Sequence, residues 1–373
     1  MTHYVPVAGG RHFVVAAGGT GGHMVPAHVL AAELTTRGHR VTLMTDARGL
    51  RFPGLFAGVT SRIVPSAVIG SPLGWPRAAL TIWRGRRDAT AFFRAEHVAA
   101  VVGFGGYPSL PPLLAAVALG RPAVLHEQNA VLGRVNRLLA GRATRIATSF
   151  APTLRLAAAY AAKTVFTGLP VRAEVASIGD APYPATTGVL EIFVTGGSQG
   201  ASILSRVVPA AIGLLPPDLR ARLHITQQCR PEDIAAVRAT YTEQGTAATC
   251  ETYFADFAAR LAAAHLVIAR SGASTMAELT AAGRPAILVP FAAATDDHQA
   301  ANAAAFVAAG AGPMLREGDF TPAAVASAIV SLTSIDALAK AAQAARSIGH
   351  PHAGATLANL VTSLGTPMKT ANA

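Results

Sequence analysis

Short apolar segments alternate with helical patterns along most of the 373-residue chain. The first apolar segment, residues 13–17, is followed by a glycine-rich turn at 18–22 and then by a stretch in which apolar residues recur with helical spacing. Those residues are Ala27, Leu30, Ala31 and Leu34. A strand, a turn and a helix in this order predict a parallel sheet with crossover helices.

The same arrangement recurs in the second half of the chain. An apolar segment at 192–195 leads into the glycine-rich turn 196–200 and then into another helical pattern, whereas residues 173–188 carry prolines and glycines without periodicity, as a linker does. The length also suits two domains, and we expect both to be doubly wound α/β sheets. The expected parts are a first domain at 1–172, a linker at 173–188, a second domain at 189–350, and a terminal helix with a tail at 351–373 that packs back on the first domain.

One uncharged stretch, residues 98–120, is long enough to mimic a membrane span. We interpret it instead as a strand, a glycine turn and a helix, because several glycines and prolines interrupt it. No targeting segment is expected, since the apolar run at 13–17 is too short for a signal core.

The composition favours an anionic partner. The net charge of +11 rests on arginine, because the lysines are only Lys163, Lys340 and Lys369, and such a balance suits phosphates, anionic lipid or nucleic acid. Hydrophobic residues make up 51%, enough for two cores. The cysteines, Cys229 and Cys250, have neither metal-ligand spacing nor a disulfide pattern, which fits a reducing cytoplasm.

The glycine-rich turns are candidate phosphate sites, because backbone amides at the start of a helix and the helix dipole favour anions. The turns at 18–22 and 196–200 have this form, and the loop at 103–109 is a third candidate. Neither turn is G-x-G-x-x-G, only Asp46 is placed to bind a nicotinamide ribose, and no Walker sequence occurs. Tight turns that serve packing alone are the alternative.

Two titratable residues follow such turns. His23 lies where a helix begins, so its imidazole should stay neutral and could accept a proton, although a capping or packing role is equally open. Glu278 either completes a capping box with Thr275 or accepts both hydroxyls of a ribose, while the amides of residues 271–275 bind a diphosphate.

A polar cluster at 296–302 follows a predicted strand, where parallel sheets place ligands. Asp297 and His298 suggest a metal, but no D-x-D motif occurs, and a loop cap is the simpler interpretation. Gln299 and Asn302 could bind sugar hydroxyls.

Both tryptophans lie in one basic segment at 73–87. Amphipathic rings beside arginines suit the headgroup layer of an anionic membrane, whereas a solvated basic face with buried tryptophans is the alternative. Nucleic-acid binding is not expected without a recognised module. The expected membrane patch consists of Leu73, Trp75, Arg77, Leu80, Trp83, Arg84, Arg86 and Arg87.

Seven motifs together resemble the MurG family of bacterial N-acetylglucosaminyltransferases, in that family's order and over nearly the whole chain. One departure is Leu169, where the family has Asn, and it concerns a polar contact in the hinge region. The motifs are residues 18–23, 103–109, 126–129, 167–172, 196–201, 270–273 with Glu278, and 297–299 with Asn302.

This resemblance implies a GT-B architecture, in which two Rossmann-like domains face each other across a cleft. The second domain would bind most of the donor, with Arg172 and Ser198 on the diphosphate, and the first domain would bind the acceptor. The residues implied for UDP-N-acetylglucosamine are Thr20, Gly21, Gly22, Asn129, Arg172, Ser198, Gln199, Phe254 (on uracil), Ala273, Ser274, Thr275, Met276, Ala277, Glu278 (on ribose), Gln299 (on the sugar) and Asn302. Those implied for the acceptor diphosphate are Gly18, Gly19, Gly103, Gly105, Gly106 and Tyr107.

The implied reaction moves N-acetylglucosamine from UDP to the C4 hydroxyl of undecaprenyl-diphospho-N-acetylmuramyl-pentapeptide (lipid I), with inversion. It forms the β-1,4-linked disaccharide of lipid II, the last cytoplasmic step of peptidoglycan precursor synthesis. His23 is the expected general base and Glu127 its rival. No cofactor, metal or nucleic acid is expected.

The implied location is peripheral, on the anionic cytoplasmic face of the inner membrane, and cell-wall synthesis and division proteins are further candidate partners. Four other functions compete: a transferase with a soluble acceptor, a UDP-sugar epimerase, a nicotinamide oxidoreductase and a non-catalytic membrane-docked binding protein. The last would not need His23, Arg172, Glu278 and Gln299 together.

Overall fold

The computed structural model describes residues 10–19, 21–49, 54–67, 74–185, 188–197 and 200–364. It divides into two compact units: unit 1 is Met1–Pro170 with His352–Ala373, and unit 2 is Val171–Pro351. None of the helices in the described ranges is by itself long and apolar enough to span a membrane, whereas Pro322–Leu332 and Asp336–Ser347, bent by 92°, meet that criterion of length and composition as a pair.

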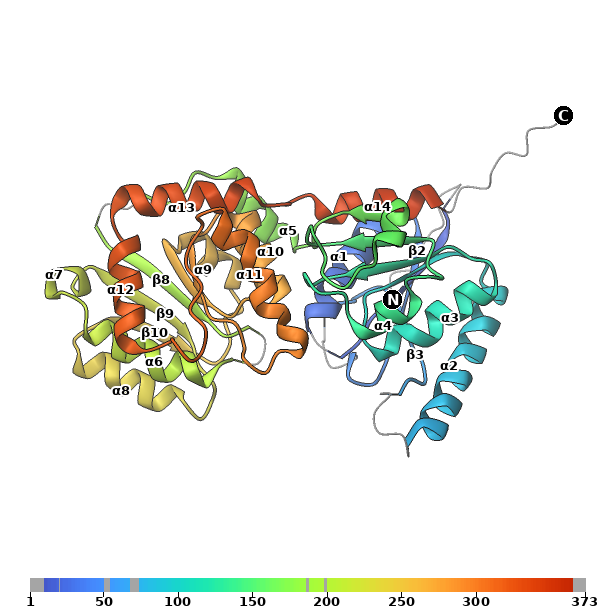
Figure 1. Ribbon diagram of the computed structural model, residues 1–373, viewed down its shortest axis with the longest axis horizontal. Helices are drawn as coiled ribbons and strands as arrows, with labels where there is room; N and C mark the ends of the chain where they lie inside the picture. Colours follow the sequence, from blue (N-terminus) through green and yellow to red (C-terminus); the bar gives the residue numbers. More distant parts are fainter. Residues whose placement is uncertain are drawn as a thin grey trace. The chain divides into compact units, whose positions relative to one another are not determined.

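Unit 1 is built on a seven-stranded parallel sheet, of which Figure 1 labels β2 and β3. The strand order is β3-β2-β1-β4-β5-β6-β7. The order reverses between β1 and β4, whose last residues Ala16 and Gly103 are paired, and ligands bind at such a switch point in doubly wound sheets. The strands are β1 (His12–Ala16), β2 (Arg40–Thr45), β3 (Thr60–Ile63), β4 (Val98–Gly103), β5 (Ala123–Glu127), β6 (Arg145–Thr148) and β7 (Thr164–Phe166). The helices are α1 (Gly21–Thr36), α2 (Trp75–Ala95), η3 (Tyr107–Ser109), α3 (Leu110–Ala118), α4 (Arg134–Leu139), η4 (Ala158–Lys163) and α14 (Ala353–Leu364).

Helices cover both faces of this sheet, because alternate residues of a strand point to opposite sides. Phe13 and Val15 pack with α1 and α14, whereas Val14 and Ala16 pack with α2, α3 and α4. The terminal helix α14, drawn in red in Figure 1, therefore belongs to unit 1 and contacts α1. The helix predicted after residue 22 and the strand, turn and helix predicted over 98–120 are confirmed.

Unit 2 has a five-stranded parallel sheet in the order β10-β9-β8-β11-β12, with its switch point between β8 and β11. Two parallel doubly wound sheets confirm the predicted fold class. The strands are β8 (Leu190–Thr195), β9 (Leu223–Gln228), β10 (Ala247–Glu251), β11 (Leu266–Ala269) and β12 (Ala286–Leu288). The helices are α5 (Ala173–Ala176), η5 (Ser177–Asp180), α6 (Ser202–Gly213), α7 (Pro217–Arg220), α8 (Ile234–Glu243), α9 (Phe257–Ala263), α10 (Ala273–Ala282), η6 (Thr295–Asp297), α11 (His298–Ala308), α12 (Pro322–Leu332) and α13 (Ile335–Ser347).

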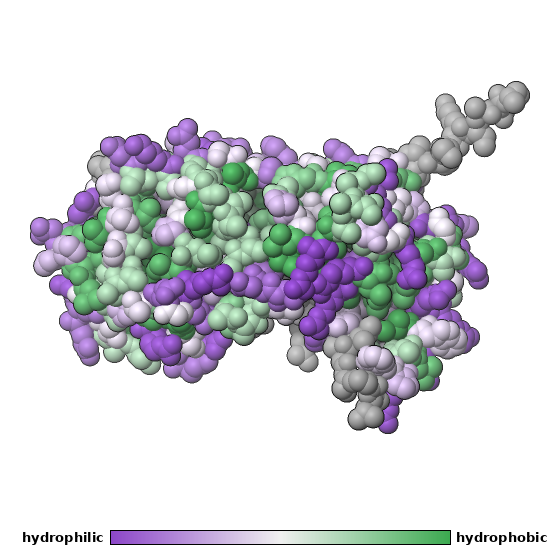
Figure 2. All heavy atoms as spheres, in the orientation of Figure 1, coloured by the Kyte–Doolittle hydropathy of each residue, from purple (hydrophilic) through white to green (hydrophobic). Residues whose placement is uncertain are grey.

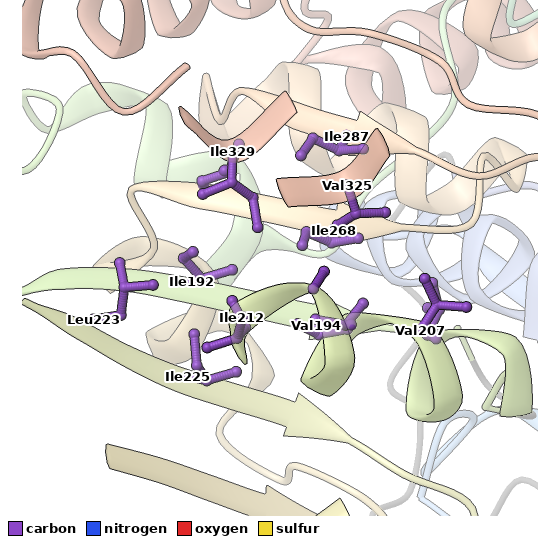
Figure 3. Packing of buried hydrophobic residues seen from close by; sticks show 14 of the residues in the cluster. Ile192, Val194, Val207, Ile212, Leu223, Ile225, Ile268, Ile287, Val325 and Ile329 are labelled. Atoms are coloured by element: carbon purple, nitrogen blue, oxygen red, sulfur yellow. The ribbon is translucent and has the colours of Figure 1, made fainter. Parts of the chain in front are cut away.

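A hydrophobic core of unit 2 lies between the sheet and helices α6, α8 and α12. Figure 3 shows branched side chains of the strands, such as Ile192 and Ile225, meeting Ile212 of α6 and Val325 and Ile329 of α12. β-Branched residues suit this buried, pleated surface.

The expected linker at 173–188 is folded over its first half. Residues 173–180 form α5 and η5 within unit 2, and the chain passes into this unit after Pro170. The side chains of Val175 and Ile178 are buried and anchor this segment. Two apolar residues are too few to show a helical period in the sequence, so these short helices were not predicted.

One buried arginine fixes helix α10. Arg284 is 1% exposed and donates hydrogen bonds to the carbonyls of Leu261 and Ala262, at the end of α9, and of Ala282, at the end of α10. Burial lowers the pKa of Arg284 to about 10, so the side chain remains a cation at neutral pH. Cations are favoured at helix C-termini, and this arginine ties the end of α10 to the end of α9.

Candidate active site

The two glycine-rich loops of unit 1 meet at its switch point. Gly18 and Gly19 follow β1, and Gly105 and Gly106 follow β4; a methyl group placed on Gly106 would lie 3.5 Å from the carbonyl oxygen of Gly18. Gly19, Gly105 and Gly106 all have positive φ angles, which favour glycine. Gly103 has a packing role instead, because a methyl group there would come within 2.4 Å of Leu113.

His23 lies on the first turn of α1 against the second loop. A methyl group on Gly105 would be 3.6 Å from its Nε2, and its Nδ1 lies 3.2 Å from the Gly18 carbonyl oxygen. A carbonyl only accepts, so Nδ1 carries the hydrogen, and the neutral ring has its lone pair on Nε2. Burial lowers the pKa of His23 below its usual value, which keeps the ring neutral at pH 7.

Glu127 ends β5 and is 2% exposed. Its Oε1 accepts a hydrogen bond from the amide of Asn129 at 3.0 Å, and its Oε2 accepts from the amide of Gly133 at 2.7 Å and from Asn136 Nδ2 at 2.8 Å. Burial raises the pKa of Glu127, and these hydrogen bonds oppose the rise. The carboxylate therefore braces the loop that carries Asn129.

A buried polar network continues from this loop to the glycines. Gln128 Nε2 donates to the Phe104 carbonyl at 2.9 Å and lies 3.2 Å from His126 Nδ1. Burial lowers the pKa of His126 to about 4, so this ring is neutral as well. The sequence motif at 126–129 had assigned no role to Gln128, and nothing in the sequence pointed to Asn136.

In unit 2, helix α10 begins at the switch point. Its N-cap is Gly272, without a side-chain cap, so the capping box proposed for Thr275 and Glu278 is not formed. The first-turn amides at 273–275 have no acceptor within the helix. The hydroxyl of Ser274 is buried without a hydrogen-bond partner among the described residues, beside these amides.

Arg172 and Glu278 form an ion pair close to this helix start. Arg172 Nη2 lies 3.5 Å from Glu278 Oε1, and Nη1 lies 3.5 Å from Glu174 Oε1. Burial raises the pKa of Glu278 to about 7, and the nearby Arg172 guanidinium opposes that rise. The Nε of Arg172 is buried and has no hydrogen-bond partner in the described part of unit 2.

Aromatic residues support this pair. The guanidinium of Arg172 stands 5.4 Å from the centre of the Phe257 ring, and both Phe257 and Phe254 pack edge-on against Phe193. Phe254 is only 6% exposed, so its ring is mainly part of the core. Phe257 and Glu174 were not singled out in the sequence, although they lie three and two residues from residues that were.

The segment after β12 holds two further expected residues. Gln299 Oε1 accepts from the amide of Phe291 at 3.0 Å, and Asn302 Nδ2 donates to the Ser271 carbonyl at 3.1 Å. Asn302 is 1% exposed, and its side chain positions the turn before α10. Asp297 pairs with Arg316 at 3.1 Å, which uses the carboxylate that had suggested a metal.

The remaining residues predicted to bind the substrates or the membrane lie in different places. The side chain of Met276 is 2% exposed and faces the core, while Ala273 and Ala277 lie on the same first turns of α10. Gly21 and Gly22 open α1, and Tyr107 opens η3. Thr20, Ser198, Gln199 and Leu73 lie outside the described residues.

Helix α2, at the edge of unit 1 in Figure 1, exposes the expected membrane patch. Trp75 is 55%, Leu80 47% and Trp83 53% exposed, which excludes the alternative of buried tryptophans. Arg77, Arg84, Arg86 and Arg87 are also exposed, and Arg87 stands 5.8 Å from the ring centre of Trp83. Over the part of α2 visible in Figure 2, hydrophobic and hydrophilic residues lie next to each other.

Comparisons with known proteins agree with these two units. Residues 13–148 match the model of the glycosyltransferase family 28 N-terminal domain, and residues 191–359 match that of the family 28 C-terminal domain. A MurG crystal structure from Acinetobacter baumannii is similar with a TM-score of 0.78 and 29% identity, covering 95% of this chain and 99% of that one. The glycotransferase of kitacinnamycin shares the fold, with a TM-score of 0.68 at 17% identity, covering 96% of this chain and all of that one.

Two curated relatives are similar over almost the whole chain. The protein from Erythrobacter litoralis is 52% identical over 95% of this chain and 90% of its own length, and that from Zymomonas mobilis is 51% identical over 96% and 93%. Both are named UDP-N-acetylglucosamine--N-acetylmuramyl-(pentapeptide) pyrophosphoryl-undecaprenol N-acetylglucosamine transferase. At this level of identity the chain belongs to the MurG family of glycosyltransferases, within glycosyltransferase family 28.

Proposed function

We propose that the protein transfers N-acetylglucosamine from UDP-N-acetylglucosamine to the C4 hydroxyl of the undecaprenyl-diphospho-N-acetylmuramyl-pentapeptide. Its relatives' names describe the same donor and lipid-linked acceptor. The observation that carries this proposal is the polar N-terminus of α10. There, the buried Arg172 Nε and Ser274 Oγ lack partners among the described residues. Buried polar atoms are rarely left unpaired, so a polar ligand is expected at this place.

A nucleotide diphosphate suits these groups. Ser274 and Glu278 lie four residues apart on one face of α10, and Arg172 lies beside Glu278. The amides at 273–275, the Ser274 hydroxyl and the guanidinium would donate to the diphosphate, where the helix dipole also favours an anion. The Glu278 carboxylate would accept both ribose hydroxyls. Backbone groups at Phe254, whose ring is buried, would contact the uracil.

In the reaction, His23 Nε2 accepts the proton of the C4 hydroxyl as the oxygen forms its bond to the anomeric carbon. The bond from that carbon to the UDP oxygen breaks on the opposite face, which gives inversion. The negative charge that develops on UDP is stabilised by Arg172 and the α10 amides, which are fixed in place before the reaction.

Glu127 is assigned a positioning role in this proposal. Its carboxylate accepts hydrogen bonds from the amides of Asn129 and Gly133 and from Asn136, and it is almost fully buried, so a substrate hydroxyl has little access to it. It would hold Asn129 in the orientation that the donor or acceptor requires.

Donor binding should strengthen as the pH rises through about 7, because Glu278 then ionises and accepts the ribose hydroxyls more strongly. The Kd for UDP-N-acetylglucosamine, measured by calorimetry, is expected to fall about tenfold between the two protonation states. This ligand is preferable to UDP, because its diphosphate is a diester that does not titrate near neutrality. The Glu278→Gln variant should show no such pH dependence; an unchanged pH profile in that variant would assign the titration to another group.

We also propose that the exposed face of α2 docks the protein peripherally on the anionic cytoplasmic surface of the membrane. Replacing Trp75 and Trp83 with serine and Arg86 and Arg87 with glutamine should weaken binding to vesicles that contain anionic lipid by about tenfold or more. Donor binding should not change. Sedimentation of vesicles with the protein measures this directly.

A matched control variant carries the same number of apolar and arginine replacements at exposed positions outside α2. It combines Leu214→Ser, Val330→Ser, Arg121→Gln and Arg206→Gln, all at exposed positions. Equal loss of vesicle binding in both variants would remove α2 as the docking surface.

The overall function is tested with radiolabelled UDP-N-acetylglucosamine, incubated with and without the lipid-linked acceptor. Label in the lipid fraction only when acceptor is present supports transfer. Loss of donor without any acceptor would indicate an epimerase or a hydrolase and would refute the proposal.

A further inference from the structure

A pocket of about 360 Å³ opens in unit 1 beside the glycine loops, lined by residues 46–48, 63–67 and Tyr107. It lies at the carboxyl ends of β2 and β3, next to the switch point between β1 and β4. Neither the residues at 46–48 nor those at 63–67 take part in the groups assigned above.

The polar wall of the pocket is an oriented arginine. Arg48 Nε donates to Asp46 Oδ2 at 2.9 Å, and Nη2 of the same guanidinium lies 2.8 Å from that oxygen. Asp46 Oδ1 accepts from the amide of Gly49 at 3.0 Å, which fixes the carboxylate. Asp46 is thus engaged by its own loop, which argues against the nicotinamide ribose considered for it.

This guanidinium faces the first glycine loop. A methyl group on Gly19 would lie 3.7 Å from Arg48 Nη2, and one on Gly18 would lie 3.2 Å from Asp46 Oδ1. The Arg48 side chain is 57% exposed and makes no other hydrogen bond within the described residues. Its remaining N–H donors are therefore available to an anion next to the loop amides.

A second part of the lining is apolar and lies beside helix α2. Ile63 is 59% exposed, and the following Val64 and Pro65 pack against α2, where a methyl group on Gly85 would lie 2.1 Å from the Pro65 carbonyl oxygen. The pocket thus combines a cation next to the loop amides with an apolar wall that packs against the helix that carries the exposed tryptophans. A ligand with an anionic group joined to a hydrocarbon chain matches that combination.

We propose that Arg48, oriented by Asp46, binds a phosphate of a polyprenyl diphosphate, and that the pocket receives the first isoprenoid units of its chain. The inference rests on the proposed function and specifies how unit 1 binds that acceptor. The guanidinium supplies a charge that glycine amides lack, and its fork can donate two hydrogen bonds to one phosphate. Because the site is half exposed, the attraction is screened by salt.

Steady-state kinetics of Arg48→Gln, Arg48→Lys and Arg121→Gln test this assignment. Arg121 is exposed and precedes β5, so it lies at the amino ends of the strands, whereas the loops lie at the carboxyl ends. Its variant is therefore the matched control. We expect Arg48→Gln to raise the KM for the lipid acceptor about tenfold while the donor KM and kcat stay unchanged. The acceptor KM of Arg48→Lys should lie between those of the unmodified protein and Arg48→Gln, since lysine keeps the charge but lacks the planar fork. The acceptor KM of Arg121→Gln should match that of the unmodified protein.

Inhibition that is competitive with the lipid acceptor, measured at saturating UDP-N-acetylglucosamine with a C15 prenyl diphosphate and with inorganic pyrophosphate, tests the arginine and the apolar wall separately. Arg48→Gln should weaken inhibition by both probes, whereas Ile63→Ser should weaken only that by the prenyl diphosphate. An acceptor KM in Arg48→Gln equal to that of Arg121→Gln would overturn the role of Arg48. Equal inhibition of the unmodified protein by both probes would overturn the binding of the prenyl chain in this pocket. Either result is distinct from failure of the proposed function, in which the unmodified protein transfers no label at all.

Discussion

Replacing His23 with alanine is expected to lower kcat by about 100- to 10,000-fold, the range that a positioned general base contributes. The hydrogen bond from Nδ1 to the Gly18 carbonyl leaves the lone pair on Nε2, the nitrogen that would take the proton. His23 does not belong to the group of residues around Arg172, so the affinity for UDP-N-acetylglucosamine should change little. Single-turnover transfer to the lipid acceptor measures the effect on chemistry.

The pH dependence distinguishes His23 from Glu127. Because burial lowers the pKa of His23, the ring is neutral and active at neutral pH, and activity is lost as the pH falls through a pKa below 6.5. Glu127→Gln is the comparison, since it keeps the shape of the brace and removes its charge. In kcat measured at saturating UDP-N-acetylglucosamine, where the pH dependence of donor binding has no effect, we expect this acid limb to persist in Glu127→Gln and to vanish from the residual activity of His23→Ala; the reverse result would make Glu127 the base.

Arg172→Ala should lower kcat by about 100-fold or more, the usual loss when a donor aimed at transition-state charge is removed. The guanidinium is held between Glu174, Glu278 and the Phe257 ring, and its Nε has no partner among the described residues. It can therefore strengthen its interaction as charge grows on the leaving UDP. Arg172→Lys should recover part of the rate, because the charge returns without the fork.

A second effect follows from the ion pair. Without Arg172 the pKa of the buried Glu278 should rise further, so at neutral pH the donor KM should rise together with the fall in kcat. Arg206→Ala, at an exposed position on α6, is the control. Kinetics of Arg172→Ala that match this control would exclude Arg172 from catalysis.

The predicted fold followed from local patterns. Apolar strands, glycine turns and helical periods are short-range signals, and a parallel sheet brings the ends of its strands to one edge. The loops that contain Gly18 and Gly105 were each a candidate anion site from the sequence, and the resemblance placed them together; in the structure, a methyl group on Gly106 would lie 3.5 Å from the Gly18 carbonyl oxygen. The motif residues Arg172 and Glu278, although far apart in sequence, lie 3.5 Å from each other in the structure, between Nη2 and Oε1.

Burial was the property that the sequence did not reveal. Gly103 and Asn302 belong to motifs, yet each is enclosed by residues outside its motif, Leu113 at Gly103 and Ser271 at Asn302. Glu127 is buried by the loop that follows it, through the Gly133 amide and Asn136. Glu278 had suited a capping box because helix starts are hard to place within one turn, and the helix begins two residues before Thr275. Whether a motif residue packs in the interior or is available to a ligand depends on tertiary contacts.

A crystal structure of the protein with bound UDP would test the donor site most directly. The diphosphate is expected within hydrogen-bond distance of Arg172 and of the amides at 273–275, with both ribose hydroxyls on Glu278. A diphosphate bound instead at the glycine loops of unit 1, with the α10 N-terminus empty, would contradict the assignment of the donor to unit 2.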